Sequence, residues 1–314
     1  MRVSSNAYTN SMLNQFSALA GQQYNLQSQV SSGLRVQAPS DDPAAMANTL
    51  SLASKKAANT QYSANISTLQ DRGNLIYNVL SSLQTKTSRA GEIATSAATA
   101  TASQSDLNGY AQEVNSMLED TVKLGNSKDA TGDQYLFGGT ASGSAPFTVT
   151  RDANNNITGV TYNGNSTVNQ AEIGTGSTAS VDVPGVNNGT TGARGLLTDS
   201  QSGADMLNHL ISLRDNLLAG NKTAITNTDS GNIQKDENNV AYQVASNGVM
   251  QNKLTAASSY ISDTTTSLNT AIANQSSADL VQTMVELNKA QTGYQAALQS
   301  SAKIMNLSIL NYIS

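Results

Sequence analysis

The chain offers few side chains for acid–base or nucleophilic chemistry. It contains one histidine, His209, and no cysteine. A catalytic histidine works with a nucleophile that it activates and a group that orients it, and neither a cysteine nor a second histidine is present. His209 lies beside Leu207 and Leu210 in a segment with helical spacing, so we interpret it as a packing or surface residue. We therefore predict no catalytic residue and no enzymatic activity.

Two short segments could bind a charged ligand. Asp41 and Asp42 are adjacent carboxylates that could contact a metal ion, but they directly precede Pro43. Asp before a helix that begins with Pro is typical of a helix cap, and we favour that interpretation. The segment Gly174-Thr175-Gly176 resembles part of a phosphate-binding loop, yet no helix or lysine follows at the required spacing. We read it as a β turn and predict no metal and no cofactor.

The composition favours a thin helical protein and argues against several functions. Aromatic residues make up 4% of the 314 residues and charged residues 12%. Large side chains fill most of a thick globular core, whereas thin bundles are built from smaller apolar residues. The net charge of −5 argues against nucleic acid, whose phosphates require a dense Lys and Arg surface. No apolar run approaches the roughly 18 residues of a membrane span, and we expect neither membrane insertion nor a cleaved signal peptide.

Both ends of the chain carry apolar residues at alternating spacings of four and three, the heptad pattern of coiled helices. Between Val3 and Ser40 the only charged residue is Arg35. An exposed helix normally has a charged outer face, so we expect other chains to cover both terminal helices. The two seams consist of Met12, Phe16, Leu19, Gln23, Leu26, Val30, Leu280, Met284, Leu287, Gln291, Tyr294, Leu298, Ser301 and Met305. The predicted assembly interface comprises their apolar members together with Ile309.

The middle of the chain divides into long helices and one strand-rich segment. Heptad spacing predicts helices over about 44–100, 107–124, 206–220 and 240–272. From Gly138 to about Gly195 this spacing disappears, and residues 147–150 and 157–162 alternate around an Asn-rich turn, which is typical of a hairpin. The predicted fold is mainly α: a long antiparallel coiled helical bundle built from both chain ends, with a small β-rich inserted middle domain. The predicted domains are terminal assembly helices (1–42 plus 276–314), a central helical bundle (43–137 plus 196–275) and a β-rich insert (138–195).

Five short motifs occur in the order found in one known family. They are Ser31-Ser32-Gly33-Leu34-Arg35-Val36, Pro39-Ser40-Asp41-Asp42-Pro43-Ala44-Ala45, Tyr135-Leu136-Phe137-Gly138-Gly139-Thr140 followed by Pro146-Phe147, Tyr162-Asn163-Gly164-Asn165, and Leu307-Ser308-Ile309-Leu310-Asn311-Tyr312-Ile313. Together they resemble the signatures of the bacterial flagellin superfamily. Pro39 and Pro43, and the segment 135–139, are more similar to its hook-associated protein 3 branch than to flagellin itself.

The resemblance implies a structural subunit of the bacterial flagellum that forms the junction between hook and filament and serves motility. Its implied partners are identical copies in a ring, a neighbouring hook-associated protein on the hook side, flagellin on the filament side and an export chaperone. It also implies secretion through the flagellar export channel without a cleaved signal peptide. Two alternatives stay open, namely a flagellin-type filament subunit and a helical stalk or pore-forming binding protein.

Overall fold

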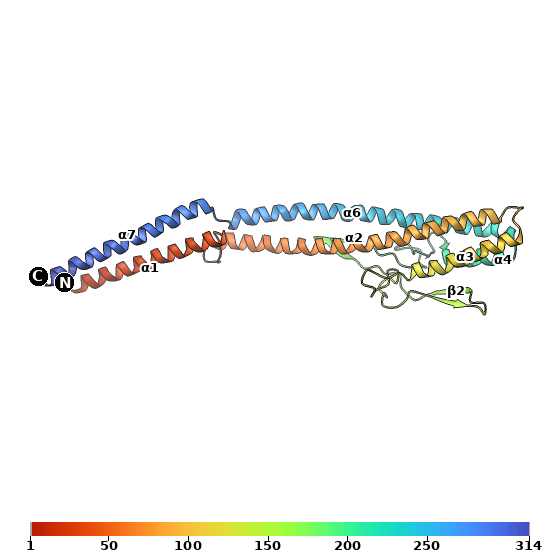
Figure 1. Cartoon of the computed structure of the whole chain (residues 1–314), viewed down its shortest axis with the longest axis horizontal. Helices are drawn as coiled ribbons and strands as arrows, with labels where there is room; N and C mark the ends of the chain where they lie inside the picture. The colour runs from red at the N-terminus through yellow and green to blue at the C-terminus, as the bar shows by residue number, and fades with distance from the viewer. Residues whose placement is uncertain (1, 314) are drawn as a thin grey trace. The chain divides into compact units, whose positions relative to one another are not determined.

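The computed structural model describes the backbone of residues 2–313 and the side-chain surroundings of residues 9–303. Long helices dominate this part of the chain (Figure 1). They are α1 (Arg2–Ser32), α2 (Pro43–Ala97), α3 (Gln104–Gly125), α4 (Met206–Leu218), α6 (Ser230–Ser276) and α7 (Leu280–Ile313). A short helix, α5 (Lys222–Ala224), and a π-helical turn, η1 (Ile225–Asp229), precede α6. The prediction of a mainly α fold with a small β-rich insertion is confirmed.

The described strands all lie between α3 and α4 in the sequence. They are β1 (Phe147–Arg151), β2 (Ile157–Tyr162), β3 (Ala171–Gly174), β4 (Ser177–Ala179), β5 (Val186–Asn187), β6 (Thr198–Asp199) and β7 (Ala204–Asp205). The β1–β2 and β3–β4 pairs are antiparallel hairpins, and β5 pairs with β6 in parallel while β7 is antiparallel to β6. The predicted hairpin over β1 and β2 is confirmed, and residues 174–176 form the turn between β3 and β4. The strands extend past residue 195 to residue 205.

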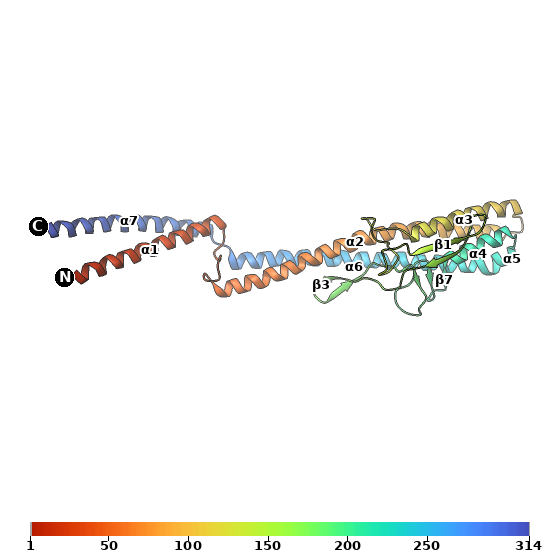
Figure 2. The ribbon, with the colours of Figure 1, turned by 90° about the horizontal axis from the view of Figure 1, so that it is seen from below.

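The chain divides into two compact units. One comprises Met1–Asn59 and Asp263–Ser314 and contains α1, α7 and the adjoining ends of α2 and α6. The other comprises Thr60–Ser262 and contains the rest of α2 and α6, together with α3, α4 and the strands (Figure 2). Residues 43–59 and 263–275 thus group with the terminal helices. The three-part division from the sequence stays a prediction.

Within the unit 60–262, the helices bury the faces that heptad spacing predicts. The α3 helix begins with a capping box, in which Ser103 Oγ accepts a hydrogen bond from the Asp106 amide and the Asp106 carboxylate accepts one from the Ser103 amide. The buried heptad residues are Ile66, Leu69, Ile76, Leu80 and Leu83 on α2, Leu107, Val114 and Met117 on α3, Met206, Leu210, Leu213 and Leu217 on α4, and Val240, Leu254 and Ile261 on α6. Burial of each such side chain stabilises the fold by about 1.5–3 kcal/mol.

Four amide side chains, one helical turn apart on α6, link this helix to main-chain carbonyl groups. We call Asn239, Gln243, Asn247 and Gln251 the amide ladder. Asn239 donates to the carbonyls of Gly195 (2.9 Å) and Leu196 (3.1 Å), Gln243 to Arg194 (2.9 Å), Asn247 to Gly73 (3.2 Å) and Gln251 to Gln70 (3.3 Å). The first two residues therefore fix the segment before β6 against α6, and the last two fix α2 against α6.

Replacing Asn239 by Ala should lower the free energy of unfolding by about 1–3 kcal/mol. The buried Leu196 carbonyl loses the bond from Asn239, and the Gly195 carbonyl keeps only a longer one from Gln243 (3.4 Å). Chemical denaturation followed by circular dichroism measures this change. Asn238→Ala is the matched control, since Asn238 is exposed on the same helix and should change stability far less. Equal effects of the two substitutions would contradict the role assigned to the ladder.

Candidate functional site

Helices α1 and α7 lie side by side and antiparallel, and their contact is the best candidate for an assembly element (Figure 1). The ring of Phe16 meets that of Tyr294 edge to face, with the ring centroids 5.9 Å apart and an interplanar angle of 77°. Leu26 on α1 and Ala290 on α7 are each 7% exposed. Most other residues of the seam are only half-buried, so the pair alone buries little apolar surface.

The residues predicted on α1 all lie on its covered face. Leu26 is buried, and Met12, Phe16, Leu19 and Val30 are half-buried. The heptad spacing therefore identifies the face of α1 that is covered. In this single chain, that face packs against α7.

On α7 the covered face differs partly from the predicted one. Leu287 and Tyr294 are half-buried and Ser301 is buried, whereas Leu280, Met284 and Leu298 are exposed by 44%, 50% and 45%. Thr283, Ala290 and Ala297 lie on the same covered face as Leu287, Tyr294 and Ser301. Small residues here let α1 approach closely, and sequence reasoning missed them because they carry no strong apolar signal. Met305 and Ile309 lie outside the residues whose side chains the structure describes.

The outer surface of the α1–α7 pair is poor in charge and carries several exposed apolar side chains. On α7, Leu280, Val281, Met284, Val285 and Leu298 are 44–76% exposed, and on α1 Leu13 and Tyr24 are 57% and 73% exposed. A shallow groove on α7 is lined by Val285, Asn288, Lys289, Thr292, Gly293 and Ala296. Spacings of three and four around such a depression match the hole that receives a side chain of a neighbouring helix in coiled coils. This surface suits contact with another helix.

An elbow joins α1 to α2 and contacts the break between α6 and α7. The amide of Arg35 donates to the Ser276 carbonyl (2.7 Å), and the Ala278 amide donates to the Gly33 carbonyl (2.9 Å). The Arg35 guanidinium bonds to Asp42 (3.2 Å) and to the Gln275 carbonyl (3.0 Å). Gly33 has a φ of +72°, a conformation that favours glycine. The two helix breaks therefore hold each other.

Asp42 caps the start of α2, as predicted, whereas Asp41 binds the backbone of the elbow before it. The Asp41 carboxylate accepts hydrogen bonds from the amides of Gln37 (3.0 Å) and Ala38 (2.9 Å), and that of Asp42 accepts one from the Ala45 amide (3.0 Å). These backbone hydrogen bonds lower the pKa of both carboxyl groups because they stabilise the charged form. Their oxygens are engaged by the protein itself.

His209 has a partner that the sequence does not reveal. Its Nδ1 lies 2.8 Å from a carboxylate oxygen of Asp236, whose side chain has no exposed surface. Asp236 also accepts a hydrogen bond from the Asp205 amide at 2.8 Å. Burial raises the pKa of Asp236 despite the opposing effect of His209. The pair connects helices whose residues lie 27 positions apart, a spacing with no periodic signal.

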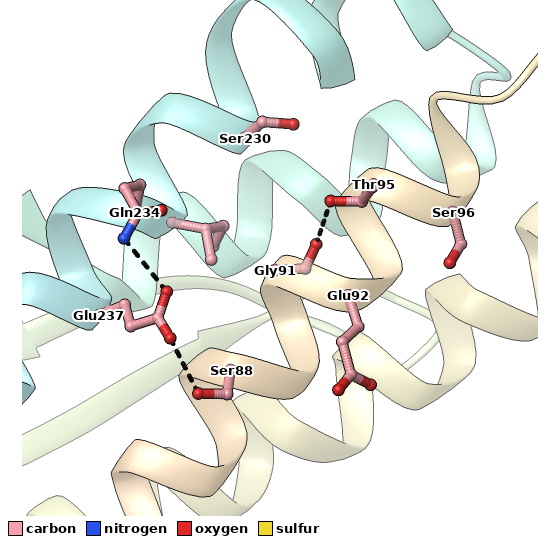
Figure 3. Close-up of a pocket in the computed structure, with 9 residues that line it drawn as sticks. Ser88, Gly91, Glu92, Thr95, Ser96, Ser230, Gln234 and Glu237 are labelled. Atoms are coloured by element: carbon pink, nitrogen blue, oxygen red, sulfur yellow. Dashed lines mark hydrogen bonds between the residues drawn. The ribbon is translucent and has the colours of Figure 1, made fainter.

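A groove of about 520 Å³ lies between α2 and α6 (Figure 3). Its lining consists of Ser88, Gly91, Glu92, Thr95 and Ser96 from α2, and Ser230, Ile233, Gln234 and Glu237 from α6. Glu237 accepts hydrogen bonds from Ser88 and Gln234, and Thr95 donates to the Gly91 carbonyl (Figure 3). The polar groups of the groove thus bond mainly to one another, and no nucleophile–base pair is formed among these lining residues.

The described residues contain no group of three or more His, Cys, Asp or Glu side chains placed to hold a metal ion. Among the described helices, none is both long and apolar enough to span a membrane.

Comparison with known proteins points to one family. The bacterial flagellin N-terminal helical region matches residues 3–142, and its C-terminal helical region matches residues 230–313. Flagellar hook-associated protein 3 of Salmonella typhimurium is 27% identical to this chain, over 70% of this chain and 66% of its own length. Flagellar hook-associated protein 3 of Escherichia coli is 32% identical, over 38% of this chain and 37% of its own length. The aligned segments thus span less than two thirds of either relative.

A solved structure has the same fold. It is that of a proposed flagellar hook-associated protein from Vibrio parahaemolyticus, with a TM-score of 0.63, 21% identity, and coverage of 76% of this chain and 100% of that one. Since the N- and C-terminal flagellin regions together match more than half of its residues, including both terminal helices, the chain belongs to the bacterial flagellin family.

Proposed function

We propose that the chain is a non-catalytic structural subunit of the bacterial flagellum, exported to the junction between hook and filament and assembled there through α1 and α7. The observation that carries this proposal is the α1–α7 pair, which is thinly packed inside and exposes several apolar side chains. The hook-associated names of the two curated relatives support the junction rather than the filament itself. The partners would be identical copies, a neighbouring hook-associated protein, flagellin and an export chaperone.

Apolar side chains of α7 remain exposed to water in the single chain. Apolar side chains scattered singly over a surface need no explanation, but Val281, Met284 and Val285 lie together on one side of a helix turn and are 48–76% exposed. Such a group usually marks an interaction site. Between residues 3 and 32 α1 carries no charged residue, so a neighbouring apolar helix could cover it without burying a charge. Association of further copies would therefore complete a core that one chain leaves partly open.

A deletion strain tests the proposal. We expect it to make hooks, to lack filaments and to release flagellin into the medium, and a copy without residues 280–314 should not restore swimming. Electron microscopy, soft-agar motility and the protein content of the medium are the measurements. A full-length copy is the control and should restore filaments. Persistence of both hooks and filaments in the deletion strain would rule out the junction role.

A flagellin-type filament subunit is the second candidate, because the matching family regions are those of flagellin. The same strain separates the two functions. If the chain is the main protein of sheared filaments, it is the filament subunit. If it is present in a small, fixed amount at the base of filaments made of another flagellin, it is the junction subunit.

A further inference from the structure

The single histidine of the chain bonds to a carboxylate that the fold encloses. Asp236 on α6 has no exposed side-chain surface, while His209 on α4 is 14% exposed and can therefore exchange a proton with solvent. The second donor to Asp236 is the amide of Asp205, at 2.8 Å. Asp205 ends β7 and immediately precedes α4. The pair therefore connects three elements, β7, α4 and α6, and we call it the His209–Asp236 clamp.

The other charged side chains described near the clamp bond to other partners, so that His209 is the cation that pairs with Asp236. From β7, Asp205 adds a second negative charge, but its carboxylate is held by Thr198 Oγ1 (3.1 Å) and Asn208 Nδ2 (2.7 Å). From β6, buried Asp199 accepts hydrogen bonds from Ser202. On α6 itself, Lys235 points to Asn232 (3.1 Å) and Glu237 to Ser88 (2.9 Å). In the described part of the chain, the recorded ion-pair partner of Asp236 is His209.

We propose that the proton on His209 sets how firmly β7 and the first turn of α4 are held against α6, so that the attachment is firmest in mildly acid solution and loosens as the pH rises toward 8. Protonated His209 and the Asp236 carboxylate form an ion pair. Loss of the proton leaves a buried negative charge with only neutral donors, which is costly. Histidine is the side chain that ordinarily changes charge between pH 5 and 8.

The direction of the pKa shift of Asp236 agrees with this proposal. Burial raises the pKa of Asp236, and a carboxyl group whose folded pKa is raised contributes stability below its unfolded pKa and loses it as the pH rises. The carboxyl groups with lowered pKa, such as Asp106 and Glu113, lose their contribution only as the pH falls through the acid range. These carboxyl groups therefore contribute no pH dependence between pH 5.5 and 8, the range in which a histidine ordinarily changes charge.

Thermal and chemical unfolding of the full chain at pH 5.5, 6.5, 7.5 and 8.0, at constant ionic strength, tests the proposal. For the natural sequence we expect the unfolding equilibrium constant to rise across this range, because the unfolded chain releases a proton that the folded pair retains. Asp236→Asn and His209→Gln should both remove this dependence. Asn238→Ala, at an exposed position on α6, should retain it. The terminal amino group also titrates here, but every variant keeps it.

Proton NMR gives a second readout on the natural chain. Because there is one histidine, its Cε1 proton gives a single resonance, whose titration should move when Asp236 becomes Asn. Amide exchange, corrected for intrinsic rates, should show β7 and the start of α4 less protected at pH 8 than at pH 5.5. An unfolding constant that does not change with pH, or a pH dependence retained by Asp236→Asn, would overturn the proposal. The result is independent of any role in the flagellum.

Discussion

A strain whose only copy carries Leu298→Asp should not swim, although the variant chain should fold. Leu298 is 45% exposed on α7, so the carboxylate remains in water in the isolated chain and costs little there. If another helix covers this surface in the assembly, the same carboxylate becomes buried without a partner, at a cost of several kcal/mol per subunit. Repetition of this cost over many copies should prevent assembly completely. Soft-agar motility and electron microscopy of the strain measure the outcome.

Leu218→Asp is the matched control for this substitution. Leu218 is a leucine of similar exposure, 52%, on α4 in the unit 60–262. The Leu218→Asp variant should fold and support swimming, because the proposed assembly surface is confined to α1 and α7. Circular dichroism of both purified variants should match the natural chain. Normal filaments with Leu298→Asp, or equal loss of motility with both variants, would mean that the outer surface of α7 is not the contact surface.

Arg72→Met should destabilise the fold more than any other single change discussed here, by about 3–5 kcal/mol. Arg72 on α2 pairs with Asp182 of the strand-rich segment, and their side chains are only 17% and 6% exposed. Arg72 also donates to the Leu136 carbonyl at 3.4 Å. Without the guanidinium, Asp182 keeps only the bonds from the amide and side chain of Asn169 (3.2 and 3.3 Å). Urea denaturation followed by far-ultraviolet circular dichroism measures the loss.

Two further variants separate a buried charge from a lost contact. Arg89→Met removes an arginine that is 46% exposed and pairs with Glu92 and Glu113 on the surface; exposed pairs contribute roughly 0–1 kcal/mol. Arg72→Met combined with Asp182→Leu should regain much of the stability, because no charge is left buried without a partner. A double variant no more stable than Arg72→Met would show that packing, rather than charge, explains the loss.

The sequence predicts the helices well where apolar residues recur without competition. On α4 the residues 206, 210, 213 and 217 form one narrow stripe, and each is buried. On α7 two stripes of residues overlap. One contains the exposed Leu280, Met284 and Leu298, and the other contains the covered Thr283, Ala290 and Ala297. Leu287, Tyr294 and Ser301 belong to both stripes. The partner helix decides between them, since α1 brings Phe16 onto Tyr294 and leaves room only for small residues such as Ala290. Which face of α7 is covered therefore depends on its contact with α1, and the spacing of apolar residues on α7 alone does not predict it.

The sequence also gives no sign of pairs formed across long separations. Asp182 lies 110 residues from Arg72, and Asp236 lies 27 residues from His209; each pair exists only once the strands and helices have packed. Strands β5, β6 and β7 contain two residues each, too few for alternation to appear. The β1–β2 hairpin could be predicted because its strands are longer and its Asn-rich turn is local, with Asn155 at a φ of 67°.

The amide ladder on α6 has a consequence for how the sequence can diverge. Its donors are specific side chains, but its acceptors are carbonyl groups that every residue type possesses. The bonds from Gln243 and Gln251 therefore do not depend on the side chains of Arg194 and Gln70, whose carbonyls accept them. Gly73 and Gly195 also supply acceptors but have no room for a Cβ. Mutational tolerance should therefore be narrow at the donor positions on α6 and at these two glycines, and broader at the acceptor positions Gln70 and Arg194.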